Sequence, residues 1–251
     1  MAASGSTSPM MISEAFGVTH DQPDLTHISH WVFDLDNTLY PSDAAVMSQV
    51  DRRMTEYVAR LLDLPHDKAR EVQKTYWRDY GTTLNGLMSN HTVDMHEFLD
   101  FVHDIDASVI TPDPQLAARI KALPGKRLVY TNGSVGHAEN IMARLGIADL
   151  FDDIFDVAAS GFVPKPHREG FDLFTSRYAL PVPESIMFED SVRNLKTAHD
   201  MGFTTVLVRA KEGPRDEESA APDEHPDHVH YAVDCLRTFL GEIRTAQNKT
   251  E

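Results

Sequence analysis

The stretch that decides the fold is HWVFDLDNTLY, residues 30–40. Trp31, Val32 and Phe33 form a short apolar run, and it stops abruptly at acidic and turn-forming residues that begin with Asp34. The pattern predicts a buried strand that ends in a polar loop. Ligands of open parallel sheets bind beyond the carboxyl ends of the strands, so the residues that follow each apolar run are the candidates for a functional site.

Downstream of Thr111 the sequence alternates between strand and helix patterns. Further strands are expected within KRLVY (126–130), FDDIFDVAAS (151–160), SIMFE (185–189), TTVLV (204–208) and near residues 229–232, with helical stretches between them. Repeated strand and helix units of this kind predict an α/β fold with a doubly wound parallel sheet.

A run of helices follows the first strand directly. Residues 44–63 carry apolar side chains three or four apart, and further helices are predicted over 66–80, with Gly81 as the stop, and over 92–103. We therefore expect a small helical subdomain at 44–105, inserted in an α/β core made of 29–43 and 106–251. Residues 1–28 are predicted to be a flexible N-terminal arm, and 211–228 an exposed acidic loop.

Composition narrows the class of partner. The 251 residues contain 39 Asp and Glu against 23 Lys and Arg, a formal charge of −16, which disfavours nucleic acid polymers and anionic membranes. The single cysteine, Cys235, cannot form an internal disulfide, and no apolar run approaches the roughly 20 residues that span a bilayer. We expect a cytoplasmic protein, a monomer or small homo-oligomer, that acts on a small molecule.

Polar and charged side chains follow four of the predicted strands. They are Asp34, Asp36 and Thr38 after the first, Thr131 and Asn132 after the second, Lys165 in the VPKP loop after the third, and Glu189 and Asp190 after the fourth. So many carboxylates in one crevice cannot all stay ionised without a cation, and an all-oxygen donor set suits Mg²⁺. The metal and the lysine together would offset the charge of a bound phosphate, to which the threonine and asparagine offer neutral donors. The set predicts a phosphoryl site.

These residues resemble, in order and in context, the four motifs of the haloacid dehalogenase (HAD) superfamily of phosphohydrolases. The DxDxT motif is Asp34 to Thr38, and the others are Thr131 with Asn132, then Lys165, then Glu189 with Asp190. The resemblance covers about residues 29–245 and implies a HAD-like Rossmannoid core. The helical subdomain resembles the cap that covers the active site in this superfamily.

The resemblance also implies a mechanism. Asp34 attacks phosphorus and becomes an aspartyl-phosphate, and Asp36 first protonates the leaving group and then activates the water. Mg²⁺ is held by Asp34, the backbone carbonyl of Asp36 and Asp190, with Glu189 in support. Dehalogenases of the superfamily lack the second aspartate, so Asp36 favours phosphate ester hydrolysis over carbon–halogen cleavage.

Two positions have supporting roles in this scheme. Thr38 completes the first motif. Asn194 stands where many relatives place a further acid, and we expect it to orient Lys165 or a metal-bound water.

Three phrases, VFDLDNTLYP, YWRDYGTTLNGL and VPKP, look like the pyrimidine 5′-nucleotidase subgroup, whose members hydrolyse UMP or CMP. The expected contacts of the leaving group are Tyr80, Thr82, Thr83 and Asn85, through stacking and hydrogen bonds. One alternative is a phosphosugar phosphatase or mutase of the same superfamily; a mutase predicts extra basic residues in the cap pocket, and the cap phrase supplies few. Another is a non-catalytic binding protein on the same fold, which would normally have lost Asp34 or Lys165.

Overall fold

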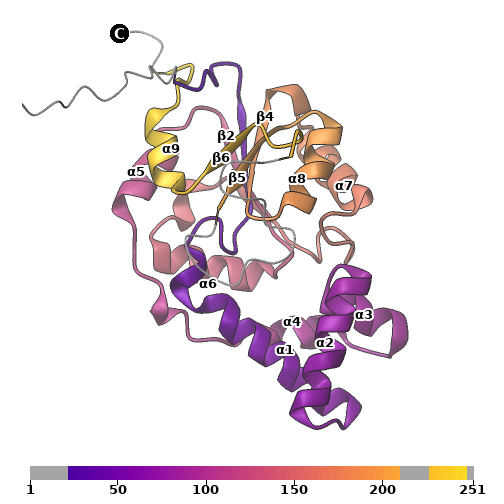
Figure 1. Ribbon diagram of the computed structural model, residues 1–251. Helices are drawn as coiled ribbons and strands as arrows, with labels where there is room; N and C mark the ends of the chain where they lie inside the picture. The colour runs from indigo at the N-terminus through magenta and orange to yellow at the C-terminus, as the bar shows by residue number, and fades with distance from the viewer. Residues whose placement is uncertain (1–21, 210–225, 248–251) are drawn as a thin grey trace, which may run out of the picture.

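The computed structural model describes residues 22–209 and 226–247, and a parallel β-sheet lies at its centre (Figure 1). The six strands run in the order β3-β2-β1-β4-β5-β6, and every neighbouring pair is parallel. The prediction of an α/β fold with a doubly wound parallel sheet is confirmed. The strands are β1 (His30–Phe33), β2 (Lys126–Tyr130), β3 (Asp153–Phe155), β4 (Ser185–Glu189), β5 (Thr204–Val208) and β6 (Tyr231–Val233).

Strand β1 is the point where the winding of the sheet reverses. It lies between β2 and β4, with Phe33 opposite Val129 on one side and Phe188 on the other. All three apolar residues of β1 are fully buried, and the rings of Phe33 and Phe188 stack at 4.6 Å. Because successive crossovers lead away from β1 in both directions, a ligand site is expected at its carboxyl end.

Helices cover both faces of the sheet (Figure 1). Trp31 and Phe33 face a core built with α5 (Pro114–Lys121), α6 (Val135–Leu145) and α9 (Leu236–Glu242). Val32 points to the opposite face, where α7 (Arg168–Tyr178) and α8 (Val192–Met201) pack. Both sides of β1 are therefore apolar, as expected of a parallel strand buried on two faces. Short 3-10 helices lie in the connections: η1 (Ser42–Ala44), η2 (Ala107–Val109), η3 (Ala148–Leu150) and η4 (Val182–Glu184).

The cap helices, α1 to α4, form a second body beside the sheet (Figure 1). They are α1 (Val46–Leu62), α2 (His66–Tyr80), α3 (Thr83–Asn90) and α4 (Met95–Val102), and they pack around a small apolar core of their own that includes Tyr57, Leu87 and Phe98. Helix α3 is absent from the sequence prediction. Thr82 starts it by accepting a hydrogen bond from the Asn85 amide, and Gly86 lets it lie against α2, since a Cβ there would stand 2.2 Å from the Cβ of Tyr76.

Two segments differ from the sequence predictions. Leu25 and Ile28 are 1% and 2% exposed, and the Leu25 amide donates to the Arg244 carbonyl, so these two residues pack in the core although they were expected in a flexible arm. Residues 1–21 lie outside the described residues, as does most of the expected acidic loop, 210–225. The expected strand at 151–160 is a strand only over Asp153–Phe155. The next residue, Asp156, instead accepts from the Val135 amide at the start of α6 and from the Ala159 amide.

In the part of the chain that the structure describes, no helix combines the length and the apolar character needed to cross a membrane.

Candidate active site

The loop after β1 is tied to the end of β4. The Asp34 amide continues the ladder by donating to the Phe188 carbonyl at 2.9 Å. Asn37 takes the left-handed backbone conformation (φ 60°), which Asn adopts more readily than most residues, and its side chain donates to Asp190 Oδ2 at 3.1 Å. The turn thus places the first and fourth motifs side by side, and Asn37 is a site contact that the sequence analysis missed.

Lys165 is the buried cation at the centre of the site. Its Nζ donates to Asp34 Oδ1 at 2.6 Å, to Glu189 Oε2 at 2.7 Å and to the Tyr130 carbonyl at 2.8 Å. Burial alone would lower the pKa of Lys165, but the two carboxylates outweigh burial and raise it above its ordinary value. The side chain is 1% exposed, so Lys165 is a permanent and immobile positive charge.

The three hydrogen bonds of Lys165 are relevant to the expected role of Asn194. A lysine ammonium has three protons, and all three of Lys165 are directed to other partners. No hydrogen bond joins the Asn194 side chain to Lys165 among the described residues, and its expected role in orienting Lys165 or a metal-bound water stays a prediction. In the structure Asn194 lies in the first turn of α8, where its backbone amide donates to the Ser191 hydroxyl at 3.4 Å.

Thr131 and Asn132 lie at the end of β2. The Asn132 side chain donates to the Lys165 carbonyl at 3.1 Å and accepts from the Lys165 amide at 2.8 Å, so it fixes the backbone that carries the cation. The Thr131 hydroxyl accepts from the Gly133 amide at 2.9 Å, which leaves its own proton to donate. The second motif thus anchors the third, a task that the sequence analysis did not foresee.

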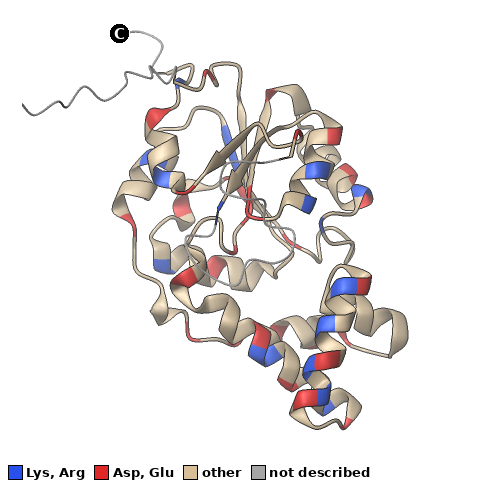
Figure 2. Cartoon of the chain, in the orientation of Figure 1, with Lys and Arg blue, Asp and Glu red and all other residues tan. Residues whose placement is uncertain are grey.

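Three carboxylates lie together at the site, and two of them, Asp34 and Glu189, bond Lys165. Oxygens of Asp34, Glu189 and Asp190 lie within 4.8 Å of one another. Burial, with Glu189 adding, raises the pKa of Asp34 to about 7 against the opposing effect of Lys165, and burial with both neighbouring acids raises that of Asp190 well above its ordinary value. A divalent cation would relieve this excess of negative charge, and the oxygen-only donors fit Mg²⁺. Figure 2 shows acidic positions in the loops at the ends of the central strands.

Thr38 is buried beside the first motif. It is 3% exposed, and its hydroxyl has no hydrogen-bond partner within 22–209 and 226–247. A buried hydroxyl without a partner is uncommon and is often satisfied by a group that binds later. This observation agrees with a site that takes up an ion and its waters.

Asp36 is held by two residues that the sequence analysis missed. Its Oδ1 accepts from the Tyr40 hydroxyl at 2.5 Å and pairs with His137 Nε2 at 2.8 Å. Burial raises the pKa of Asp36, but His137 and then Tyr40 outweigh it, so that the pKa lies below its ordinary value. Tyr40 stands only four residues after Asp36, whereas nothing local marks a histidine in α6 as a contact of the loop after β1.

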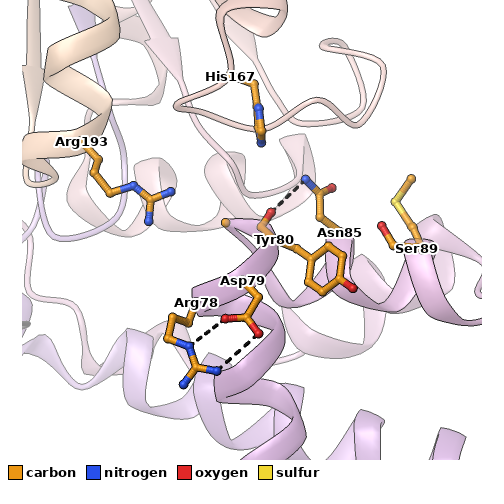
Figure 3. A pocket seen from close by; sticks show the side chains of 9 residues that line it. Arg78, Asp79, Tyr80, Asn85, Ser89, His167 and Arg193 are labelled. Atoms are coloured by element: carbon orange, nitrogen blue, oxygen red, sulfur yellow. Dashed lines mark hydrogen bonds and ion pairs between the residues drawn. The ribbon is translucent and has the colours of Figure 1, made fainter.

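A pocket of about 490 Å³ lies between the cap helices and the core (Figure 3). Tyr80 and Asn85 line it, as expected of substrate contacts. The other two expected contacts do not: Thr82 caps α3, and Thr83 is 2% exposed and donates to the Gln73 carbonyl. Contact of Thr82 or Thr83 with the leaving group stays a prediction. The pocket is lined by Arg78, Asp79, Tyr80, Gly81, Asn85, Met88, Ser89, His167 and Arg193.

Known proteins share this architecture. The chain resembles phosphate metabolism protein 8 of Saccharomyces cerevisiae, 26% identical over 219 residues that cover 80% of this chain and 68% of that protein. A HAD phosphatase from Thermococcus onnurineus superposes with a TM-score of 0.54 at 19% identity, over 86% of this chain and all of that one. The L-2-haloacid dehalogenase RSc1362 gives 0.53 at 17% identity, over 85% and 97% of the two chains. At these identities the structural likeness shows the fold alone.

The family model of haloacid dehalogenase-like hydrolases matches residues 28–202. The match runs from the start of β1 to the end of α8 and so includes Asp34, Lys165 and Asp190. It covers well over half of the chain, which confirms the prediction of an enzyme of the hydrolase class. The chain belongs to the haloacid dehalogenase-like hydrolase family.

Proposed function

We propose that this hydrolase is a Mg²⁺-dependent phosphomonoesterase that works through an aspartyl-phosphate on Asp34. The observation that carries the proposal is the position of Lys165, whose ammonium is bonded to both Asp34 and Glu189 in a buried site. A fixed positive charge beside a carboxylate nucleophile suits a reaction in which negative charge is spread over phosphoryl oxygens. Asp36, half-buried and close enough to raise the pKa of Asp34, favours phosphate esters over carbon–halogen bonds.

The reaction then has two displacements. In the first, an Asp34 oxygen bonds to phosphorus while the bond from phosphorus to the ester oxygen breaks, and Asp36 gives a proton to the departing alkoxide. In the second, water attacks the same phosphorus, Asp36 takes its proton, and the Asp34 carboxylate is released with inorganic phosphate. Lys165 stays charged throughout, and the Thr131 hydroxyl proton is available to a phosphoryl oxygen.

The acidic cluster would hold the metal. Asp34, Asp190 and the Asp36 carbonyl are the proposed ligands, and Glu189 supports them while it also bonds Lys165. When bound, Mg²⁺ supplies positive charge that neutralises the nucleophile and the phosphoryl oxygens. We expect EDTA to abolish hydrolysis and Mg²⁺ to restore it, with a rise in melting temperature on adding Mg²⁺ that Asp190→Asn weakens. Full activity in EDTA would contradict the proposed metal site.

For the substrate we propose pyrimidine 5′-nucleotides, UMP or CMP. Tyr80 is 36% exposed and so offers a ring on which a base can stack. Asn85 offers an amide, and the guanidinium of Arg193 projects from the core side toward the same pocket (Figure 3). Donors of this kind match the carbonyl oxygens of a pyrimidine.

A second candidate, a phosphosugar phosphatase or mutase, is favoured by the basic side chains of the pocket. Arg78, His167 and Arg193 line it, which is more basic character than the cap phrase alone indicates. These groups would suit a sugar that carries a second phosphate.

The test is a comparison of kcat/KM for UMP, CMP, a sugar monophosphate and a sugar bisphosphate on the same preparation. We expect the nucleotides to be hydrolysed best, with Asp34→Asn inactive on all four esters. A clear preference for the bisphosphate would replace the nucleotide proposal by the second candidate. Loss of phosphate release in Asp34→Asn separates this enzyme from any contaminating phosphatase.

A further inference from the structure

We propose that Tyr40 and His137 are positioning residues for Asp36: they hold one oxygen of its carboxylate so that the other is presented to the leaving group and, later, to water. The inference rests on the proposed phosphomonoesterase function and adds to it the residues that orient its proton donor.

Both donors converge on the same oxygen. The Tyr40 hydroxyl lies 2.5 Å and His137 Nε2 lies 2.8 Å from Asp36 Oδ1. The second oxygen, Oδ2, faces the Cα of Gly133: a Cβ built there would stand 3.7 Å from Oδ2 and 3.3 Å from the Thr131 hydroxyl oxygen. Oδ2 therefore borders the same space as the threonine that we expect to contact the phosphoryl group.

The two donors are themselves fixed. The His137 side chain is fully buried in the first turn of α6, and Tyr40 is 3% exposed. The ring of His103 stacks on that of His137 at 4.3 Å between centroids, and its Nδ1 pairs with the hydroxyl of Ser134, the residue that caps α6. Both donors are thus packed in the interior, and hydrogen bonds to two such packed groups favour one orientation of the carboxylate.

The direction of the hydrogen bond follows from the chemistry of the partners. In the proposed mechanism Asp36 is either ionised or holds its proton on Oδ2, so Oδ1 accepts in both states and the His137 ring must donate from Nε2. In a neutral ring this leaves Nδ1 unprotonated, and among the described residues Nδ1 has no hydrogen-bond partner. The bond to Asp36 is thus the polar contact that the His137 ring makes in the described chain.

Loss of this orientation should depend on the leaving group. The alkoxide of an alkyl phosphate departs poorly unless it is protonated, so it needs Asp36 in the correct position. The p-nitrophenolate ion is a stable anion that departs without a proton. The ratio of kcat/KM for an alkyl phosphate to that for p-nitrophenyl phosphate therefore measures proton delivery separately from the rest of the site.

The experiment compares His137→Gln, His137→Asn and Tyr40→Phe with wild type. The amide nitrogen of glutamine can take the place of ring Nε2, whereas that of asparagine ends near the position of Nδ1 and cannot reach Asp36. We expect His137→Asn and Tyr40→Phe to lower kcat/KM for the alkyl ester about 10- to 100-fold and for the aryl ester less than about threefold, and glutamine to restore most of the loss.

Melting temperatures control for folding. If His137→Asn does not fold, Tyr40→Phe, which removes a single oxygen atom and keeps the ring, decides the matter through the same ratio. Equal losses on both esters in the folded variants, or no advantage of glutamine over asparagine, would overturn the inference. Retention of activity by Asp34→Asn would instead overturn the proposed function, so the two failures are distinguishable.

Discussion

The strand ends and the cap helices place their polar residues in very different ways. At the strand ends Asp34, Lys165 and Glu189 are buried and joined by hydrogen bonds of 2.6 to 2.7 Å. In the cap, the Asn85 side chain reaches the Tyr80 carbonyl only at 3.4 Å. The sheet thus sets the geometry of the chemistry, whereas the cap offers side chains that can adapt to a substrate. Changes at the strand ends should abolish turnover, and changes in the cap should alter preference.

The largest effect is expected from Asp34→Asn. The change keeps the size of the side chain but removes the nucleophile, so kcat for p-nitrophenyl phosphate should fall at least about 10⁴-fold. The free energy of unfolding should not fall, because the change removes one of three crowded carboxylates. Near wild-type turnover by Asp34→Asn would contradict the claim that the strand ends carry the chemistry.

The second-largest effect is expected from the loss of the buried cation, Lys165. Lys165→Met leaves Asp34 and Glu189 buried without their partner, so unfolding in urea without metal should cost about 3 to 5 kcal/mol less than in wild type. Lys196→Met, on the exposed part of α8, is the matched control, since that lysine is 59% exposed and, within 22–209 and 226–247, its ion pair is with Asp200. Its unfolding midpoint should match wild type, and equal losses in the two variants would contradict a special role for burial.

A smaller effect should appear in the pH dependence of stability. Burial, with His137 adding, lowers the pKa of His103 from 6.5 to about 3. Between those values the unfolded chain binds a proton that the folded protein does not, so stability is lost as the pH falls below 6.5. From about pH 7.5 to about pH 5, wild type should lose about 2 kcal/mol relative to His103→Asn, which keeps a polar group for Ser134 but cannot titrate.

Urea unfolding of both proteins at the two pH values measures this difference. Parallel losses in wild type and His103→Asn would mean that His103 titrates normally in the folded protein.

The smallest effect is expected in the cap. Asn85→Ala should change the ratio of kcat/KM between UMP and a sugar phosphate about 3- to 10-fold, without a comparable loss on p-nitrophenyl phosphate. Asn90→Ala is the control in the same helix, because Asn90 bonds the Gly86 carbonyl and does not line the pocket. Equal losses of kcat/KM on every ester in Asn85→Ala would contradict a role of the cap in substrate preference.

The fold and the grouping of the acids could be predicted because they depend on local patterns. Asp34, Glu189 and Asp190 each stand at or next to the end of an apolar run, and a parallel sheet brings such ends to one edge. What could not be predicted depends on contacts between distant segments. His137 is 101 residues from Asp36, and a histidine in the first turn of a helix carries no sign of its partner.

The cap was predicted less well for a related reason. Helix α3 is eight residues long and contains a glycine, so its hydrophobic periodicity is weak. The reason for that glycine is the close contact of Gly86 with Tyr76 of α2, which the sequence does not reveal. Thr82 and Thr83 were expected to contact the leaving group, yet the Thr82 hydroxyl caps α3 and the Thr83 hydroxyl joins α3 to the Gln73 carbonyl of α2. Capping of a helix is a common structural use of a polar residue at its start.

The chain passes between core and cap twice, near Tyr40 and near His103, and both crossings adjoin Asp36, the first directly and the second through His137. An exchange of cap helices between members of this family should therefore keep Tyr40 and His103 and replace only residues between them. A cap exchange that replaced either residue would change the surroundings of Asp36 as well as the substrate preference of the recipient.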